Sequence, residues 1–232
     1  MLLEHLPRVG ELTLEGPIDK LKKVLGLSAP NRVAVDDPNA TIKLASTLID
    51  HLQEVFVPKR PITLFCIGTD RSTGDCLGPL VGTGFERLNL PGVTVYGTLD
   101  APVHAGNLDE ILQELPADEQ EAIIAVDACL GKADNVGTIS VRPGPLSPGT
   151  GVNKRLPQVG HLHIVGVVNV GGFMEYFVLQ NTRLNLVVRL SELVIAGLRL
   201  ALLQHFHLYS PAINEQDFGL LPFQDPRDKA IY

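Results

Sequence analysis

The fold is decided by residues 62–79, which read Ile62-Thr63-Leu64-Phe65-Cys66-Ile67-Gly68-Thr69-Asp70-Arg71-Ser72-Thr73-Gly74-Asp75-Cys76-Leu77-Gly78-Pro79. The first six residues form a short, nearly continuous apolar run between Pro61 and a loop rich in Gly, Asp and Ser. Such a run is typical of a strand buried on both faces. After the loop, a helix is predicted over about residues 77–88. A strand, a loop and then a helix are the repeating unit of a parallel sheet.

The rest of the chain alternates strands and helices in the same way. Apolar runs predict further strands, and apolar residues at helical spacing predict helices. The strands are expected at 93–99, 122–126, 138–142 and 162–168, and the helices at 42–56, 107–115, 174–179 and 184–206. We therefore expect an α/β fold, a three-layer α/β/α arrangement with a mostly parallel central sheet.

The two ends of the chain are expected to lie outside this domain. Residues 1–36 are predicted to form an N-terminal extension with one short helix near residues 17–25. A single α/β domain follows over residues 37–208. Residues 209–232 contain three prolines and are predicted to form a loosely packed C-terminal tail.

Composition narrows the function classes. The chain has 232 residues and a net charge of −7, which argues against a nucleic-acid partner because phosphate binding needs basic surface. The most apolar stretch, residues 184–206, is interrupted by Arg189, Glu192 and Arg199, so we expect a buried helix and no membrane span. Three cysteines and no secretory signal predict a cytoplasmic protein without a disulfide framework.

Acidic residues follow three successive predicted strands. Asp70 and Asp75 follow the first strand, Asp100 and His104 follow the second, and Asp127 follows the third. In a parallel sheet the loops at the carboxyl ends of the strands meet at one edge, which is where ligands bind. We therefore expect these side chains to be neighbours.

Each of these residues also has a structural interpretation. Asp75 suits a helix cap, Asp70 an Asx-turn, Asp100 a turn before Pro102, and His104 an ordinary loop histidine. Asp127 is harder to explain in this way, because an acid at the end of an apolar strand needs a partner.

Two kinds of chemistry suit the cluster. A carboxylate pair such as Asp75 and Asp127 can divide one proton, so that one acts as base and the other as acid. Alternatively, the two acids and His104 can hold a divalent metal, nickel or zinc. A thiol role for Cys76 or Cys129 is disfavoured, because negative neighbours raise a thiol pKa.

The loops nearby offer candidate binding groups. A phosphate-binding loop is disfavoured because no Gly-Lys-Ser/Thr motif is present and the acids would repel phosphate. Cations could instead stabilise negative charge that develops on a substrate, or hold a substrate carboxylate. The predicted substrate-binding residues are Asp70, Arg71, Asn153, Lys154 and Arg155, although the last three also suit a solvated turn.

These residues resemble a known family. Residues 66–79, with the loops at 100–108 and 126–131, resemble the signature of the YyaC-type sporulation proteins of spore-forming Firmicutes. The resemblance covers about residues 60–205. That family is similar to two peptidase groups with a phosphorylase/hydrolase-like α/β fold. One is the germination protease that degrades small acid-soluble spore proteins, and the other is the hydrogenase maturation endopeptidases.

The resemblance implies a peptidase-like protein of the sporulating cell. Asp75 and Asp127 match the two acids of both peptidase groups, and in the hydrogenase group two acids and a histidine chelate nickel. Residues 149–155 are similar to a loop of the germination protease. We therefore expect catalysis by Asp75, Asp127 and His104 on a protein or peptide substrate, with Asp75 and Asp127 as candidate metal ligands. A non-catalytic peptide- or metal-binding protein stays open, as does an oligomer.

Overall fold

The computed structural model describes residues 16–25, 30–117, 120, 122–149 and 156–207. Six strands form one sheet in the order β1-β5-β6-β4-β2-β3. The pairs β3–β2, β2–β4 and β4–β6 are parallel, whereas β5 is antiparallel to both β6 and β1. The expected mostly parallel sheet is therefore confirmed. The strands are β1 (Val33–Ala34), β2 (Ile62–Cys66), β3 (Val93–Tyr96), β4 (Ile123–Gly131), β5 (Thr138–Pro143) and β6 (Leu162–Val170).

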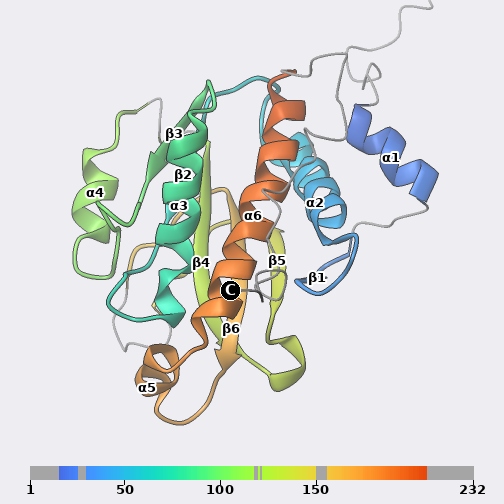
Figure 1. Cartoon of the computed structure of the whole chain (residues 1–232). Coiled ribbons are helices and arrows are strands. Elements are labelled where there is room, and N and C mark those ends of the chain that lie inside the picture. The colour runs from blue at the N-terminus through green and yellow to red at the C-terminus, as the bar shows by residue number, and fades with distance from the viewer. Residues whose placement is uncertain (1–15, 26–29, 118–119, 121, 150–155, 208–232) are drawn as a thin grey trace, which may run out of the picture.

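Helices cover both faces of the sheet (Figure 1), as expected for a three-layer α/β fold. Helix α6 packs against α2 and α3 on one face, and these helices share the main core with β2, β4 and β6. Helix α4 covers a smaller apolar cluster on the other face. The α-helices are α1 (Pro17–Leu25), α2 (Ala40–Val55), α3 (Leu77–Leu88), α4 (Leu108–Glu114), α5 (Glu175–Gln180) and α6 (Leu184–His205), and the short 3₁₀ helices are η1 (Gly74–Cys76) and η2 (Ala133–Asn135).

Burial explains why β2 has so few polar residues. All five of its residues are buried, because β3 and β4 pair with it on either side and helices cover both faces. Helix α6 is apolar for a similar reason, since it packs across α2 and α3. None of the helices in the described part of the chain combines the length and apolar character needed to cross a bilayer.

Strand lengths differ from the prediction at the carboxyl edge. β4 was expected to end at Val126 but continues to Gly131, and β6 continues to Val170. The two strands extend together because they pair with each other along most of their length, with a register shift between Cys129 and Leu130. β2 ends earlier, at Cys66, so the edge of the sheet is stepped.

Some residues placed in the N-terminal extension pack on the domain. Ile18 of α1 is buried, and the side chain of Asp19 accepts a hydrogen bond of 2.8 Å from Gln204 in α6. Val33 and Ala34 pair with β5. The division at residue 36 stays a prediction. The predicted tail, residues 209–232, lies outside the described residues.

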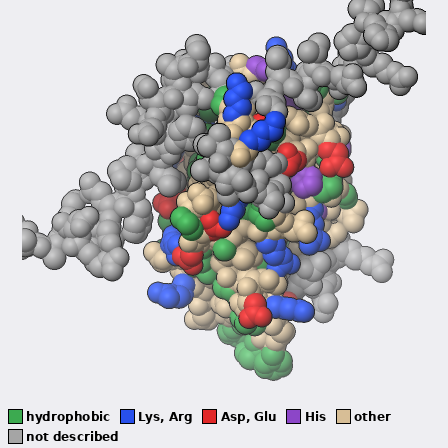
Figure 2. Space-filling view, turned by 90° about the vertical axis from the view of Figure 1, so that its right-hand side faces the viewer, with side chains coloured by type: hydrophobic (Ala, Val, Ile, Leu, Met, Phe, Trp, Pro, Cys, Tyr) green, Lys and Arg blue, Asp and Glu red, His purple; other side chains and the backbone are tan. Residues whose placement is uncertain are grey.

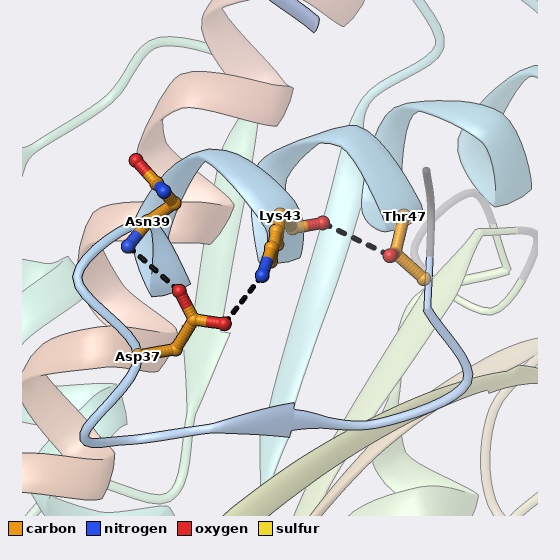
Figure 3. Close-up of polar contacts among 4 residues, drawn as sticks. All are labelled: Asp37, Asn39, Lys43 and Thr47. Carbon is orange, nitrogen blue, oxygen red and sulfur yellow. Dashed lines mark hydrogen bonds and ion pairs between the residues drawn. The ribbon is translucent and has the colours of Figure 1, made fainter. Parts of the chain in front are cut away.

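The loop before α2 is fixed by one carboxylate. Asp37 accepts a 2.8 Å hydrogen bond from the backbone N–H of Asn39 and pairs with the ammonium of Lys43, in the first turn of α2 (Figure 3). These contacts hold the pKa of Asp37 below its usual value, with the Lys43 hydrogen bond as the largest cause. Thr47, the next turn on, donates back to the Lys43 carbonyl. The start of α2 is thus held by local polar contacts.

Gly68 lets the chain turn back sharply after β2. Its φ of +147° disfavours any residue with a side chain, and a Cβ there would lie 2.0 Å from the carbonyl oxygen of Asp75. The same carbonyl accepts a hydrogen bond of 3.1 Å from Thr69 N–H. Gly68 therefore allows η1 to lie directly over the end of β2.

We predict that Gly68→Ala destabilises the protein more than Gly172→Ala. Gly172 is a matched control, because its φ is +141° but no atom lies within 4 Å of an added Cβ. Backbone strain should cost about 1–3 kcal/mol at either position. The clash should cost Gly68→Ala about another 1–3 kcal/mol. Urea unfolding measures both variants, and equal losses would mean that the close approach to Asp75 does not constrain the loop.

Candidate functional site

Asp127 lies at the step in the sheet edge. The backbone N–H of Ile67 donates to the Val126 carbonyl at 2.7 Å, and there the pairing of β4 with β2 ends. Asp127 is the next residue and pairs only with Val165 of β6. It was expected in the loop after the strand, and it lies within the strand because β6 continues beside it. Its carboxylate thus stands where β2 has stopped and the β2–η1 loop crosses.

Asp75 reaches the same edge from the loop. It is the middle residue of η1, and its backbone N–H donates to the Ser72 carbonyl at 3.0 Å. The residues that precede η1 and α3, Thr73 and Cys76, make no side-chain cap hydrogen bond. The structural interpretation of Asp75 as a cap stays a prediction. Contacts between η1 and β4 bring this acid to the strand that carries Asp127.

The charge of Asp75 perturbs the ionisation of Asp127. Burial raises the pKa of Asp127 to about 8, the charge of Asp75 adds to the rise, and a 2.7 Å hydrogen bond from Ala128 N–H opposes it. Although residue 127 keeps some exposed surface, its carboxyl group is enclosed by protein atoms. Burial also raises the pKa of Asp75. At neutral pH the pair therefore keeps a proton, although no hydrogen bond joins the two carboxyl groups in the described structure.

Ser72 is a third polar group at this point. It is only 6% exposed. Its hydroxyl lies close enough to the Asp75 carboxylate to oppose the rise in that group's pKa, as a hydrogen-bond donor does. Buried hydroxyls in proteins are normally paired, and the Asp75 carboxylate is the acceptor within reach of this one. Sequence reasoning missed Ser72, because a serine in a polar loop gives no signal of burial.

The other predicted residues are spread along this edge. Asp70 and Arg71 are exposed in the β2–η1 loop. His104 lies at the same edge, beside Val103, which bridges to Ile67 at the end of β2. Its ring Nδ1 accepts a 3.1 Å hydrogen bond from Gly106 N–H. Asn153, Lys154 and Arg155 lie outside the described residues.

The cysteines are poor nucleophiles here. Cys66 is fully buried, and burial raises its pKa above any physiological range. Burial and the charges of Asp70 and Asp75 raise the pKa of Cys76. Burial raises the pKa of Cys129 to about 11, and the charge of Asp127 adds to that rise.

Arg32, just before β1, is a cation that acts on this region. Its charge opposes the rise in the pKa of Cys129. Sequence reasoning missed this residue, because Arg32 lies in a segment predicted to be an extension. Its proximity depends on β1 joining the sheet through β5.

The donor set does not fit the predicted nickel or zinc site. Catalytic zinc has three protein ligands, usually with at least one histidine or cysteine. Among the described residues no group of three His, Cys, Asp or Glu side chains is placed to hold a metal ion. The hydrogen bonds of His104 that order its loop go to Asn107 and Gly106. The chemistry considered below therefore depends on the two carboxyl groups.

Comparison with known proteins places this chain in a family. A family model described as "Protein of unknown function (DUF1256)" matches residues 32–197. The chain belongs to the DUF1256 family. Over 142 residues, this DUF1256 protein is 54% identical to the uncharacterized protein YyaC of Bacillus subtilis (strain 168), covering 61% of this chain and 69% of YyaC. The resemblance to YyaC-type proteins is confirmed.

The DUF1256 chain also has a distant structural likeness. It matches the crystal structure of a NiFe hydrogenase maturation protease, HycI, from Thermococcus kodakarensis KOD1, with 19% identity and a TM-score of 0.40. The match covers 64% of this chain and 99% of that one. A likeness at this level does not bear on what the acid pair does.

We predict that Asp127→Asn stabilises the protein increasingly as pH rises. Unfolded Asp titrates near pH 4, whereas folded Asp127 titrates near pH 8. Between these values the unfolded chain binds fewer protons than the folded one, so wild-type stability falls with rising pH. The amide removes this cost and can still accept the Ala128 hydrogen bond.

The gain from Asp127→Asn should be small at pH 4–5 and grow by about 1.4 kcal/mol per pH unit, to about 5 kcal/mol near pH 8. Guanidinium unfolding at both pH values measures the difference. Asp134→Asn, at an exposed position in η2, is the control and should show no such pH trend. A difference between wild type and Asp127→Asn that stayed constant with pH would contradict the raised pKa.

Proposed function

We propose that this protein hydrolyses peptide bonds with Asp75 and Asp127 as an acid–base pair. One observation carries the proposal. Two carboxyl groups from separate elements meet at the carboxyl edge of a parallel sheet, where their shared environment keeps a proton on the pair at neutral pH. No structural role that we can identify accounts for this costly arrangement.

Two acids in these states can cleave an amide by activating water. The ionised Asp75 accepts a proton from a water molecule, whose oxygen attacks the carbonyl carbon of the peptide bond. The protonated Asp127 gives its proton to the carbonyl oxygen, so that a neutral tetrahedral intermediate forms.

Collapse of the intermediate returns both groups to their starting states. Asp75 gives the proton it accepted to the amide nitrogen, and the carbon–nitrogen bond breaks. Asp127 takes a proton back from a hydroxyl of the intermediate. The products are a carboxylic acid and an amine, and one water molecule is consumed.

The remaining residues have supporting roles in the proposal. Arg71, together with Asn153, Lys154 and Arg155, is proposed to hold the substrate backbone or stabilise developing negative charge. Asp70 would contact a basic group of the substrate. His104, which orders the loop after β3, would carry protons at the rim of the site. A protein or peptide substrate in the cytoplasm of a sporulating cell is proposed from the sequence resemblance alone.

We predict that Asp75→Asn and Asp127→Asn each lower peptidase activity by about 10²–10⁴-fold, the usual contribution of a general acid or base. The assay incubates purified full-length protein with small acid-soluble spore proteins and with unfolded casein, and mass spectrometry identifies the products. Asp134→Asn is again the control and should keep wild-type activity. Because the donor set does not fit a metal, activity should be the same with a chelator and with added zinc or nickel.

The assay also separates this proposal from a non-catalytic one. If wild type and Asp127→Asn give equal, background cleavage with every substrate and metal, hydrolysis is excluded. Tight capture of a peptide without turnover would then establish a binding protein. Product in large excess over protein would exclude that alternative.

We predict a bell-shaped pH profile for kcat. The rate should fall above about pH 8 as Asp127 loses its proton, and it should fall on the acid side below the raised pKa of Asp75. Ser72→Ala should move the acid limb to higher pH, because the hydroxyl opposes the rise in the pKa of Asp75. An acid limb that does not move in Ser72→Ala would show that the Ser72 hydroxyl does not affect the ionisation of Asp75 during catalysis.

A further inference from the structure

Apolar side chains are exposed around α5, where solvent would favour polar ones. Phe173 is 88% exposed and Phe177 is 54% exposed, and Val170, Met174 and Tyr176 are exposed beside them. Figure 2 shows hydrophobic side chains gathered at the lower end of the molecule, at the height where Figure 1 places α5. Single exposed apolar residues are common, but a contiguous group of this kind marks a site of interaction.

These side chains border a groove of about 620 Å³ between the end of β6 and α5. That volume is in the range of sites that bind small molecules or a few side chains. The groove is lined by Asn169, Val170, Gly171, Phe173, Met174, Phe177, Val178 and Asn181.

Hydrogen bonds hold the groove in shape. The side-chain amide of Asn169 donates to the Val178 carbonyl at 3.3 Å and to the Thr182 hydroxyl at 3.2 Å. Thr182 donates in turn to the Val178 carbonyl at 2.9 Å. These bonds fix α5 against the end of β6. The groove is therefore already formed without a ligand, which reduces the entropy cost of binding.

The segments that line the groove contact both elements that carry the acid pair. On one side α5 packs on η1, since a Cβ at Gly74 would lie 2.7 Å from the Leu179 side chain and 3.0 Å from its backbone. Gly74 precedes Asp75, and Leu179 follows Val178 of the groove. On the other side, Gly171 N–H donates to the Gly131 carbonyl at the end of β4, the strand that carries Asp127.

We propose that this groove binds an apolar segment of the substrate polypeptide, next to the peptide bond that Asp75 and Asp127 cleave. The proposal rests on the proposed function and names the substrate class, an unfolded or extended segment with large apolar side chains next to the cleaved bond. An extended chain is the occupant that spans both features, because it continues from the groove to the acids.

A second copy of this chain fits the position less well. A folded copy seated on Phe173 and Phe177 would lie beside the edge that carries the acids and would hinder access to them. The same apolar side chains would then be an assembly surface, and the acid pair would lack a route for substrate. The oligomeric state in solution therefore tests the choice.

Binding is measured separately from cleavage with full-length Asp127→Asn protein. The probes are two fluorescein-labelled peptides of equal length and charge, one with a central Leu-Phe-Leu and one with Ser-Gly-Ser there. Fluorescence anisotropy should show at least tenfold tighter binding of the Leu-Phe-Leu peptide, the gain expected from burying one large apolar side chain. Adding Phe173→Ser and Phe177→Ser should remove that preference.

Leu184→Ser in the same Asp127→Asn background is the control. Leu184 is 57% exposed, slightly more than Phe177, but does not line the groove. Its loss should leave both affinities unchanged, and circular dichroism should show that every variant is folded. Equal affinity for the two peptides, or equal loss in the control and the groove variant, would overturn the proposal.

Sedimentation velocity gives the remaining outcome. A wild-type dimer that dissociates in the Phe173→Ser/Phe177→Ser variant, with no difference in peptide binding, would assign the groove to a second copy and overturn the proposal. A preference for the apolar peptide without hydrolysis by wild type would contradict the proposed peptidase and leave the groove as a peptide-binding site. In an active wild type, the groove substitutions should raise KM for the apolar peptide with little change in kcat.

Discussion

The hydrogen bond from Ile67 N–H to the Val126 carbonyl is the point on which the site depends. There β2 stops while β4 continues beside β6, so the sheet edge has a step. The chain leaving β2 must turn back over that step, and Gly68 provides the close approach that the turn requires. Asp75, carried by the returning loop, and Asp127, left beyond the end of β2, are thereby brought together. A β2 longer by one more pair would fill the space that they share.

The step has an electrostatic consequence. Two carboxyl groups held out of water and near each other cannot both ionise without a large cost, so a proton stays on the pair. The hydroxyl of Ser72 and the backbone N–H of Ala128 reduce this cost but do not remove it. A fold selected only for stability would replace such a pair with neutral side chains. Proteins retain arrangements that lower folding stability mainly at functional sites.

The apolar groove is built from the same extension of the sheet. Because β6 runs on to Val170, its end projects past β2 and supports α5 through Asn169. The helix contacts η1 on one side and leaves Phe173 and Phe177 in solvent on the other. Long β4 and β6 strands therefore account both for the placement of Asp127 and for the apolar surface beside it.

The sequence by itself determined the fold class, the helix over residues 77–88 and the buried strand that precedes it, because apolar periodicity reflects local burial. It also singled out Asp127, because an acid at the end of an apolar strand needs a partner, and the resemblance to the two peptidase groups paired Asp75 with it. Tertiary structure decided the rest. Asp127 lies within β4 because the length of a strand depends on its neighbour, here β6. The burial of Ser72 and the approach of Arg32 both depend on contacts between segments far apart in the chain, which local patterns do not encode.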